Sequence, residues 1–456
     1  MRLGSLIPSR FLQGDIIMAE YIIPVMDAQS DSSAIQDAIK TAISTGVNCV
    51  LIPKKENSQY WEIDKTVLLP SNITIILDDC HLRLKDGVFE NIFRNENMYK
   101  EDTYTLDGEQ DNIHIIGRGS AVLDGGNPNG LTEATSEKNG MPHVRNNNLI
   151  LLHNVSNYVL EGFKLINQRW WAINQLFCRN GRLSHLSFFN GKLQHNQDGI
   201  NLRVGCNNIL IEDITGRTGD DTIALSAFPK GKDIQFKVEG KDADIHDVII
   251  RDIRASTRQT IVAMRNNDGA QLYRIVVENV FDITPSEYTP WGVVKIGENN
   301  YYRERSSILG ETREITLRNI HSQGAGCIFL GASLQDSSIS NVYASGGTMH
   351  AISTFLPEMV FAENNCSICG GIDMKNVIIE NVFYNGSAAY CDDMGDGSYK
   401  NRYTYPGKPF SGCALDFRCM RAGDRLQNVI FRNIFTDSKE RLTALASNME
   451  PLNVLN

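Results

Sequence analysis

Short stretches in which apolar and polar residues alternate recur through most of the chain. Each begins at a polar turn residue, continues with alternating β-forming residues and ends with Asn or Asp followed by an apolar residue. Close copies lie at residues 207–214, 246–253, 272–280, 312–320, 374–382 and 426–434, and looser copies at 111–119, 156–163 and 180–188. Period-2 alternation of β-branched residues predicts a short strand with one buried face in each copy.

The spacing of these strands predicts how they are arranged. No helical segment of crossover length separates most of them, which excludes repeated βαβ units. Short strands that recur at a period of about 20 residues or more are typical of stacked coils. We therefore predict an all-β parallel β-helix, in which inward Ile, Val and Leu stack on their counterparts about 4.8 Å away. A β-sandwich with irregular hairpins is the alternative.

An amphipathic helix is predicted before the first strand, at residues 30–46. Asp31 or Ser32 is placed to cap its start, and Gly46 to end it. Its apolar stripe consists of Ala34, Ile35, Ala38, Ile39 and Ile43. Because a solenoid needs its open end covered, we expect this helix to cap the first coil.

The organisation of the chain follows from this pattern. We expect residues 1–20 to be a leader or N-terminal extension, residues 21–435 to form the β-helix domain, and residues 436–456 to form a C-terminal cap or tail. Insertions interrupt the repeat at 120–150, 225–245, 281–312, 351–372 and 384–426. Long irregular loops usually carry function, so we expect the insertions to form either walls of a sugar groove or a self-association surface.

Composition narrows the class of protein. The 456 residues are 42% hydrophobic and 21% charged, with a formal net charge of −10, which is typical of a soluble globular protein. Without a basic run, the chain is not expected to bind nucleic acid or an anionic membrane, and no apolar run approaches bilayer-crossing length. Pro8, Arg10 and Asp15 interrupt any N-terminal signal segment. We expect a cytoplasmic monomer and keep secretion as the alternative.

The ten cysteines are scattered through the chain. Those in strand-like segments are predicted to be buried thiols in a reducing compartment: Cys49, Cys80, Cys178 and Cys327. A CxxC pair and later cysteines raise the possibility of zinc: Cys366, Cys369, Cys391, Cys413 and Cys419. The later cysteines form no second CxxC, so we expect no metal and no other cofactor.

Two segments share one frame: "HNQDGINL" (195–202) and "TGDDTIAL" (218–225). Asp198 in the first matches Asp221 in the second, and 221 − 198 gives a spacing of 23 residues. This spacing of about one coil places both aspartates on the same face. Asp220 joins them only if the chain bends, which Gly219 permits. We therefore predict Asp220 at a turn corner and Asp221 at the start of a strand.

Clustered carboxylates raise one another's pKa, so that one stays protonated near neutral pH while the others are ionised. This division supplies an acid and a base for cleaving a glycosidic bond. Two alternatives remain. The aspartates either bond only to turn amides, or they hold a calcium ion.

The same segments resemble a known family. "NQDGINL" and "GDDTIAL" are similar to the "NTDG" and "GDD" motifs of glycoside hydrolase family 28, the polygalacturonase-like enzymes. "NQRWWAINQLFCRNGRLSHLSF" (167–188), "DSSAIQDAIKTA", "LPSNITIILDD" and "IIGRGSAVLDGG" also resemble the family, and the likeness spans about residues 27–300. The resemblance implies a single-stranded right-handed β-helix of the pectin-lyase type and an inverting hydrolase. It also implies that Asp220 protonates the leaving oxygen while Asp198 and Asp221 activate water.

The chain departs from the family at several positions that bind substrate. Gln259 stands where the family has His, and only Lys295 falls near the family's Arg-Ile-Lys segment, in a shifted register. Arg265 is placed to compensate. A polyuronate needs cationic partners for its carboxylates, so a neutral or differently linked glycan, or a short oligosaccharide, becomes the favoured substrate.

Residues beside the motifs complete the predicted site. His195, Asn196 and Gln197 abut Asp198 and are further candidates for substrate contact. Of the adjacent pair Trp170 and Trp171, one is expected in the core and the other against a sugar ring, and the resemblance implies that Trp171 is the buried one.

Three functions are compatible with this pattern. The first is an inverting glycoside hydrolase, polygalacturonase-like, that degrades a plant cell-wall or other polysaccharide or oligosaccharide. The second is a β-helix polysaccharide lyase, which needs a basic residue and calcium. The third is a non-catalytic glycan-binding or structural β-helix.

Overall fold

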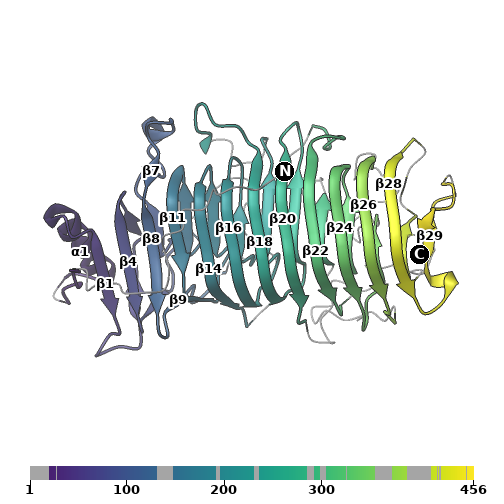
Figure 1. Ribbon diagram of the computed structural model, residues 1–456. Helices are drawn as coiled ribbons and strands as arrows, with labels where there is room; N and C mark the ends of the chain where they lie inside the picture. The colour runs from purple at the N-terminus through teal and green to yellow at the C-terminus, as the bar shows by residue number, and fades with distance from the viewer. Residues whose placement is uncertain are drawn as a thin grey trace.

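The computed structural model describes residues 20–26, 28–130, 147–191, 196–230, 236–284, 292–297, 304–324, 326–354, 372–387, 412–418, 420, 423–447 and 449–455. They form a solenoid of stacked coils (Figure 1). Helix α1 (Asp31–Thr45) covers one end, and the last strands lie at the other. Part of each predicted insertion lies outside the described residues.

One sheet follows the whole length of the solenoid. Its main strands pair in parallel, each with the next along the axis. These strands are β1 (Cys49–Pro53), β4 (Ile73–Asp78), β8 (Ile113–Arg118), β11 (Val155–Glu161), β14 (Arg179–Phe189), β16 (Asn207–Arg217), β18 (Ile245–Ser256), β20 (Leu272–Asp282), β22 (Thr312–Ser322), β24 (Leu334–Ala344), β26 (Met374–Tyr384), β28 (Leu426–Thr436) and β30 (Val454–Leu455). The shorter strands of this sheet are β2 (Trp61–Ile63), β5 (His81–Leu84), β7 (Gln110–Asp111), β9 (Val122–Asp124) and β12 (Lys164–Ile166).

A second parallel sheet of 12 strands completes the coils. Its strands are β3 (Val67–Leu69), β6 (Phe93–Asn95), β10 (Ile150–His153), β13 (Ile173–Leu176), β15 (Ile200–Leu202), β17 (Ile223–Ala227), β19 (Thr260–Asn266), β21 (Gly292–Gly297), β23 (Gly326–Gly331), β25 (His350–Ser353), β27 (Cys413–Phe417) and β29 (Thr443–Leu445). Most are buried along their whole length and therefore show no alternation of apolar and polar residues. The sequence pattern did not predict them for that reason.

The core consists of aliphatic ladders between the two sheets. One ladder runs through consecutive long strands in exact pairing register, and each of its members is at most 3% exposed. Its members are Leu183, Ile211, Ile250, Val277, Leu317, Ile339, Ile379 and Phe431. Parallel pairing and this stacking confirm the predicted β-helix and exclude the β-sandwich, whose strands are antiparallel.

Helix α1 begins and ends at specific residues. Ser30 caps its start through its side chain, and Gly46 ends it in a left-handed conformation with φ 74°. The prediction of Gly46 is confirmed, whereas the prediction of Asp31 or Ser32 as the cap is wrong. Both side chains instead accept hydrogen bonds from main-chain N–H groups within residues 62–65, which fixes the helix to the first coil.

The apolar stripe of α1 differs from its prediction at one position. Ile43 is 39% exposed, whereas Ala42 is fully buried. Ala42 follows Ile39 by three residues and so lies on the same face of the helix. The other predicted members of the stripe are buried as expected.

Asparagine and aspartate bend the long strands. Asn279, Asn319, Asn341, Asn381 and Asn433 all have φ between 54° and 58°, in the left-handed region. Their side-chain amides bond between coils, as between Asn319 and Asn279 (2.8 Å) and between Asn433 and Asn381 (2.9 Å). Asparagine tolerates this conformation, so it suits the position that closes each copy of the repeat, but these residues lie inside the long strands rather than after them.

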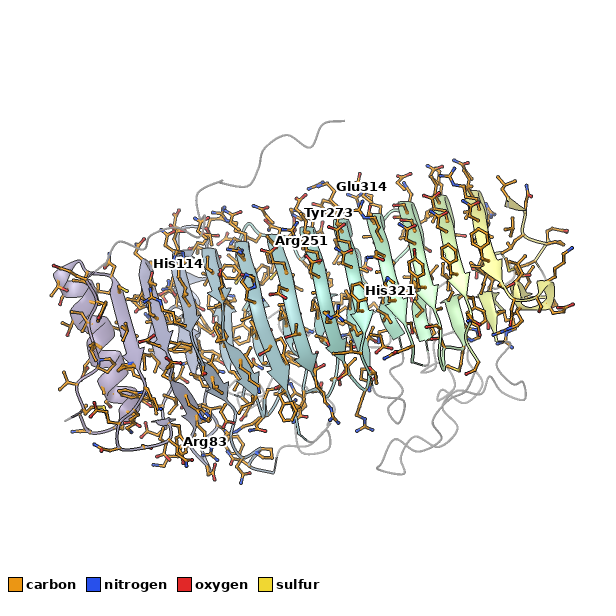
Figure 2. The ribbon with its side chains drawn as sticks, turned by 60° about the horizontal axis from the view of Figure 1, so that its bottom comes forward. Arg83, His114, Arg251, Tyr273, Glu314 and His321 are labelled. Carbon is orange, nitrogen blue, oxygen red and sulfur yellow. The ribbon has the colours of Figure 1, made fainter. Side chains whose placement is uncertain are left out.

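An aromatic ladder lies on the outer face of the long sheet. The rings of Phe281, His321, Tyr343, Phe383 and Phe435 come from consecutive strands, with centroids 4.5 to 5.1 Å apart and nearly parallel planes. Figure 2 labels His321 on this face. The ring faces contact one another between coils, so the ring edges face solvent. The ladder therefore stabilises the stacking of neighbouring coils.

The end of the chain continues the solenoid. Strand β29 pairs with β27, and β30 pairs with β28, so residues beyond 435 add to the last coils. Among the described residues there, Lys439–Arg441 form a 3-10 turn, and another such turn lies at Glu101–Thr103. In the described part of the chain, no helix has the length and apolar character needed to cross a membrane.

The described cysteines are buried and form no disulfide. They include Cys49, Cys80, Cys178 and Cys327, for which burial was predicted. The paired Cys366 and Cys369, together with Cys391 and Cys419, lie outside the described residues.

Candidate active site

Adjacent strands of the second sheet place the predicted aspartates on neighbouring coils. Asp198 lies two residues before Ile200 in β15, and Asp221 lies two residues before Ile223 in β17. Ile200 and Ile223 are paired in register, so the two aspartates occupy equivalent positions about 4.8 Å apart along the axis. The main-chain N–H of Gly199 donates to the carbonyl of Asp221 at 3.0 Å, which joins the two turns. The predicted one-coil relation is thus present.

Asp198 is buried among polar groups. It is 4% exposed, and its carboxyl accepts a hydrogen bond from the side chain of Asn201 at 3.2 Å. Burial raises the pKa of Asp198 well above its ordinary value, the charges of Asp220 and Asp221 raise it further, and Arg265 and Asn201 oppose them. Burial and the neighbouring charges therefore favour the protonated form of Asp198.

Asp221 has the opposite environment. Its carboxylate forms an ion pair with Arg265 at 2.7 Å, in which the two side chains are 3% and 14% exposed. The main-chain N–H of Thr260, on the next strand, donates to its other oxygen at 3.1 Å. A neighbouring guanidinium and a backbone donor both favour the charged form of a carboxylate. Arg265 also supplies the positive charge that a calcium ion would otherwise bring to this group.

Asp220 lies in a bend and is less buried than the other two aspartates. Its two carboxylate oxygens accept main-chain hydrogen bonds from Asn196 at 2.6 Å and Asp221 at 2.9 Å. The hydroxyls of Thr218 and Thr257 donate to its carbonyl oxygen. The predicted turn corner is confirmed, whereas β17 begins two residues after Asp221 rather than at it.

The predicted substrate-binding residues occupy different surroundings. Gln197 is buried, donates from its side chain to the carbonyl of Gln168 at 3.0 Å, and accepts the N–H of Gly219 on its own carbonyl at 3.1 Å. It therefore supports the bend at Asp220. Gln259 and Lys295 are 7% and 2% exposed, at the start of β19 and within β21.

Two more residues were predicted to contact the substrate. Asn196 is buried, and its main-chain N–H contacts Asp220 as described above. His195 lies outside the described residues. Contact of any of these residues with substrate stays a prediction.

The tryptophan pair is the reverse of what the resemblance implied. Trp170 is 1% exposed and belongs to the core, whereas Trp171 is half-buried. The guanidinium of Arg203 lies over the ring of Trp171, 4.8 Å from its centroid, and 5.9 Å from that of Phe228. Arg203 was not among the predicted site residues, although it directly follows the "DGINL" strand that carries Asp198.

A second cation near the site was also missed. Arg258 directly precedes Gln259 and is 5% exposed. Arg203 directly follows β15 and Arg258 lies two residues before β19, so both belong to coils near the aspartates.

Comparison with known proteins finds a family that part of the chain resembles. The model of glycosyl hydrolases family 28 matches residues 64–246. The chain has no significant match among curated proteins.

Solved structures share the overall fold. A surface adhesin of Streptococcus pneumoniae, PfbA, has a TM-score of 0.52 at 11% identity, covering 80% of this chain and 87% of its own. A polygalacturonase from Erwinia carotovora ssp. carotovora has a TM-score of 0.49 at 13% identity, covering 98% and 100%. An exopolygalacturonase from Thermotoga maritima has a TM-score of 0.47 at 14% identity, covering 77% and 83%. Identities this low bear on the fold alone.

The family match contains both aspartate motifs and the strands that carry them. It agrees with the parallel β-helix of the structure and with the one-coil relation of the two motifs. The similarity to glycosyl hydrolases family 28 thus extends over residues 64–246.

Proposed function

We propose that the protein is an inverting glycoside hydrolase, polygalacturonase-like, whose reaction takes place at Asp198, Asp220 and Asp221. One observation carries the proposal: two adjacent coils bring together a buried carboxyl, Asp198, and a carboxylate paired with an arginine, Asp221. Hydrolysis of a glycosidic bond by inversion needs one acid and one base at the same time.

Each aspartate has a role that follows from its surroundings. The charge of the nearby Asp220 is one cause of the raised pKa of Asp198, and the protonated form of Asp198 supplies the acidic proton. Asp220 is the more exposed of the two and donates this proton to the leaving oxygen. Asp221, ionised beside Arg265, and Asp198, once it has passed its proton on, take the proton of the attacking water. The water oxygen bonds to the anomeric carbon as the glycosidic bond breaks.

The proposed substrate class follows from the ion pair between Arg265 and Asp221. Its guanidinium is already bound to Asp221, so it does not compensate for the missing family cations as a partner for a uronate carboxylate. Lys295 is almost fully buried. We therefore favour a neutral or differently linked α-glycoside over polygalacturonate at the reacting subsite, with short oligosaccharides as the preferred length.

The test is a substrate panel with a matched pair of variants. Purified protein is incubated with pectic oligomers and with neutral α-glycosides, and released sugar is measured. Asp220→Asn is expected to lower the rate by at least ~10²-fold while far-ultraviolet circular dichroism stays unchanged. Asp213→Asn is the control, because Asp213 is an exposed aspartate on β16 that pairs with His185 instead of the cluster. It is expected to retain full activity.

Other outcomes contradict the proposal. A product that absorbs in the ultraviolet through a new double bond indicates a lyase. Sugar binding without any release from the panel indicates a non-catalytic β-helix. Equal loss of activity in Asp213→Asn and Asp220→Asn shows that the aspartate cluster has no special role. The anomeric form of the first product, followed by NMR, tests inversion.

A further inference from the structure

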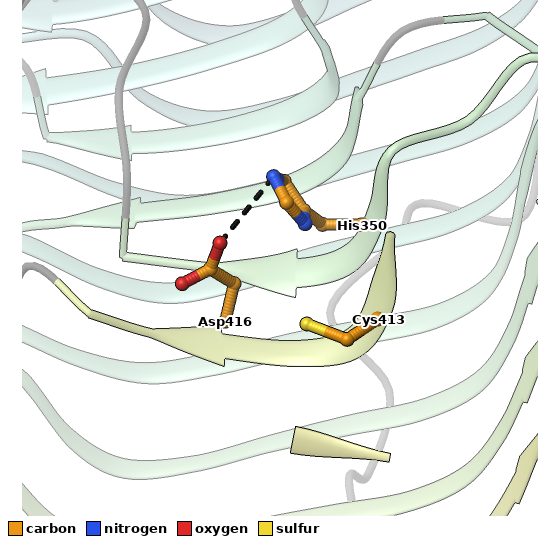
Figure 3. Close-up of side chains that lie close together, drawn as sticks. All are labelled: His350, Cys413 and Asp416. Atoms are coloured by element: carbon orange, nitrogen blue, oxygen red, sulfur yellow. Dashed lines mark ion pairs between the residues drawn. The ribbon is translucent and has the colours of Figure 1, made fainter. Parts of the chain in front are cut away.

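A second cluster of reactive side chains lies far from the aspartates, near the C-terminal end of the second sheet. Figure 3 shows its members, His350, Cys413 and Asp416. His350 begins β25, Cys413 begins β27, and the two residues are paired in register on adjacent strands. One ligand atom from each residue lies within 4.8 Å of the others. Five strand spacings separate β15 from β25, so the cluster is about 24 Å along the axis from Asp198.

The cluster is buried in the second sheet. His350, Cys413 and Asp416 are 1%, 1% and 0% exposed. Imidazole nitrogen, thiolate sulfur and carboxylate oxygen are the donors that zinc takes in proteins.

The spacing of two donor atoms matches tetrahedral coordination. Zinc bonds of about 2.0–2.3 Å place tetrahedral ligand atoms about 3.3–3.8 Å apart. His350 Nε2 and Asp416 Oδ2 are 3.5 Å apart (Figure 3). The thiol of Cys413 donates to the carbonyl of Leu415 at 3.4 Å, and its sulfur lies within 4.8 Å of the other two ligand atoms.

Arg418 orients the carboxylate. Its Nε donates to Asp416 Oδ1 at 2.9 Å and its Nη2 to Oδ2 at 2.6 Å. The Nε of Arg418 also lies 3.1 Å from Oδ2, and its main-chain N–H donates to Oδ1 at 3.1 Å, while Oδ2 is the oxygen nearest His350. Carboxylates that bind metals are commonly held in this way by an outer hydrogen-bond donor. The alternative is that the Asp416–Arg418 ion pair is purely structural and the cluster holds no ion.

We propose that His350, Cys413 and Asp416 bind a zinc ion that fastens two successive coils to each other at the C-terminal end of the solenoid. One nitrogen, one sulfur and one oxygen donor suit zinc, whereas calcium and magnesium take oxygen ligands. On binding, the thiol proton of Cys413 is released to solvent and the thiolate bonds to the ion. Because residues 354–412 separate β25 from β27 in sequence, the ion joins segments that are distant along the chain.

The experiment measures metal binding to the full chain and does not depend on enzymatic activity. Protein stripped with a chelator is titrated with zinc chloride, and bound metal is counted by mass spectrometry after desalting. Cobalt replaces zinc in a parallel titration, where a near-ultraviolet charge-transfer band reports a thiolate ligand. We expect about one ion per chain, a thiolate band and a higher melting temperature with zinc.

Variants locate the ion. Cys413→Ser and His350→Ala are expected to weaken binding by at least ~10-fold and to abolish the rise in melting temperature. Cys327→Ser is the matched control, because Cys327 is another buried thiol of the same sheet, on β23. It is expected to bind zinc as the unaltered protein does.

Two results overturn the proposal. The first is the absence of bound metal and of a thiolate band in the folded, unaltered protein, which is decisive even if a variant fails to fold. The second is undiminished binding in Cys413→Ser, which places the ion on other thiols. The hydrolase proposal survives either result, because its aspartates lie four and five strands away from β25.

Discussion

Replacement of Arg265 by glutamine separates the electrostatic part of the aspartate cluster from its shape. The substitution leaves a long polar side chain but removes the charge that pairs with Asp221. Asp221 is then a carboxylate in a side-chain environment that is 3% exposed, with Thr260 as its remaining backbone donor.

The expected cost follows from this burial. Removing one partner of a buried ion pair destabilises a protein by about 3–5 kcal/mol. Arg265 is 14% exposed, so we expect a loss near the lower limit, about 3 kcal/mol in the free energy of unfolding. Loss of the positive charge also raises the pKa of Asp198 further, because Arg265 opposes that shift. The limb of the activity profile that reports Asp198 therefore moves to higher pH.

The assay is a double-mutant cycle followed by urea unfolding. Arg265→Gln and Asp221→Asn are measured singly and together, with kcat/KM determined for each variant that remains folded. The double variant removes both charges, so it is expected to recover most of the stability lost in Arg265→Gln. It is not expected to recover activity, since Asp221 is then unable to take a proton from water.

One result would refute this account of the pair. If Arg265→Gln and the double variant unfold at the same urea concentration, the charge of Asp221 costs nothing when unpaired, and the ion pair does not hold it in place. Activity in the double variant equal to that of the unaltered protein would remove Asp221 from the reaction.

Three further predictions concern the scaffold. Arg179 and Lys241 bond to Glu109 and lower its pKa from 4.5 to about 2. The contribution of Glu109 to the free energy of unfolding is therefore present above pH 4.5 and is lost as the pH falls toward 2. Glu109→Gln should remove about 1–2 kcal/mol of this pH dependence in urea unfolding. Tyr343→Ala breaks two ring contacts of the aromatic ladder and should cost about 1–3 kcal/mol, whereas Tyr343→Phe should cost much less by the same measurement. Asn319→Ala should lower the melting temperature more than Asn319→Gly, because only alanine is strained at φ 58°; equal effects would assign the whole cost to the lost amide bonds.

Most long strands of the long sheet could be predicted from the sequence, because the alternation of apolar and polar residues is a local pattern. Strands β16, β18, β20, β22 and β28 each contain a predicted copy of the repeat. Strand β24 was not among the copies, since "LQDSSISNVYA" has serines where its neighbours have aliphatic residues. The structure still pairs it in register between β22 and β26, which shows that neighbouring coils impose the conformation on a weak segment.

The candidate site was predicted in part. The shared frame was sufficient to place Asp198 and Asp221 on adjacent coils, because the frame and the coil length coincide. The partner of Asp221 was not predicted, since Arg265 lies 44 residues further along the chain and on another coil. The tryptophan assignment failed for a related reason: which of two adjacent rings faces the core depends on how the turn before β13 is oriented, and no residue pattern there specifies it.

The sequence by itself determined the strands, the left-handed asparagines and the one-coil relation of the aspartates, because alternation, turn propensity and repeat length act over a few neighbouring residues. The tertiary structure alone decided which carboxyl keeps a proton, which is paired with arginine, and that His350 meets Cys413 and Asp416. These properties depend on burial and on contacts between coils. Insertions of different lengths separate the strands along the sequence, whereas parallel pairing in register brings the same strands next to one another in space.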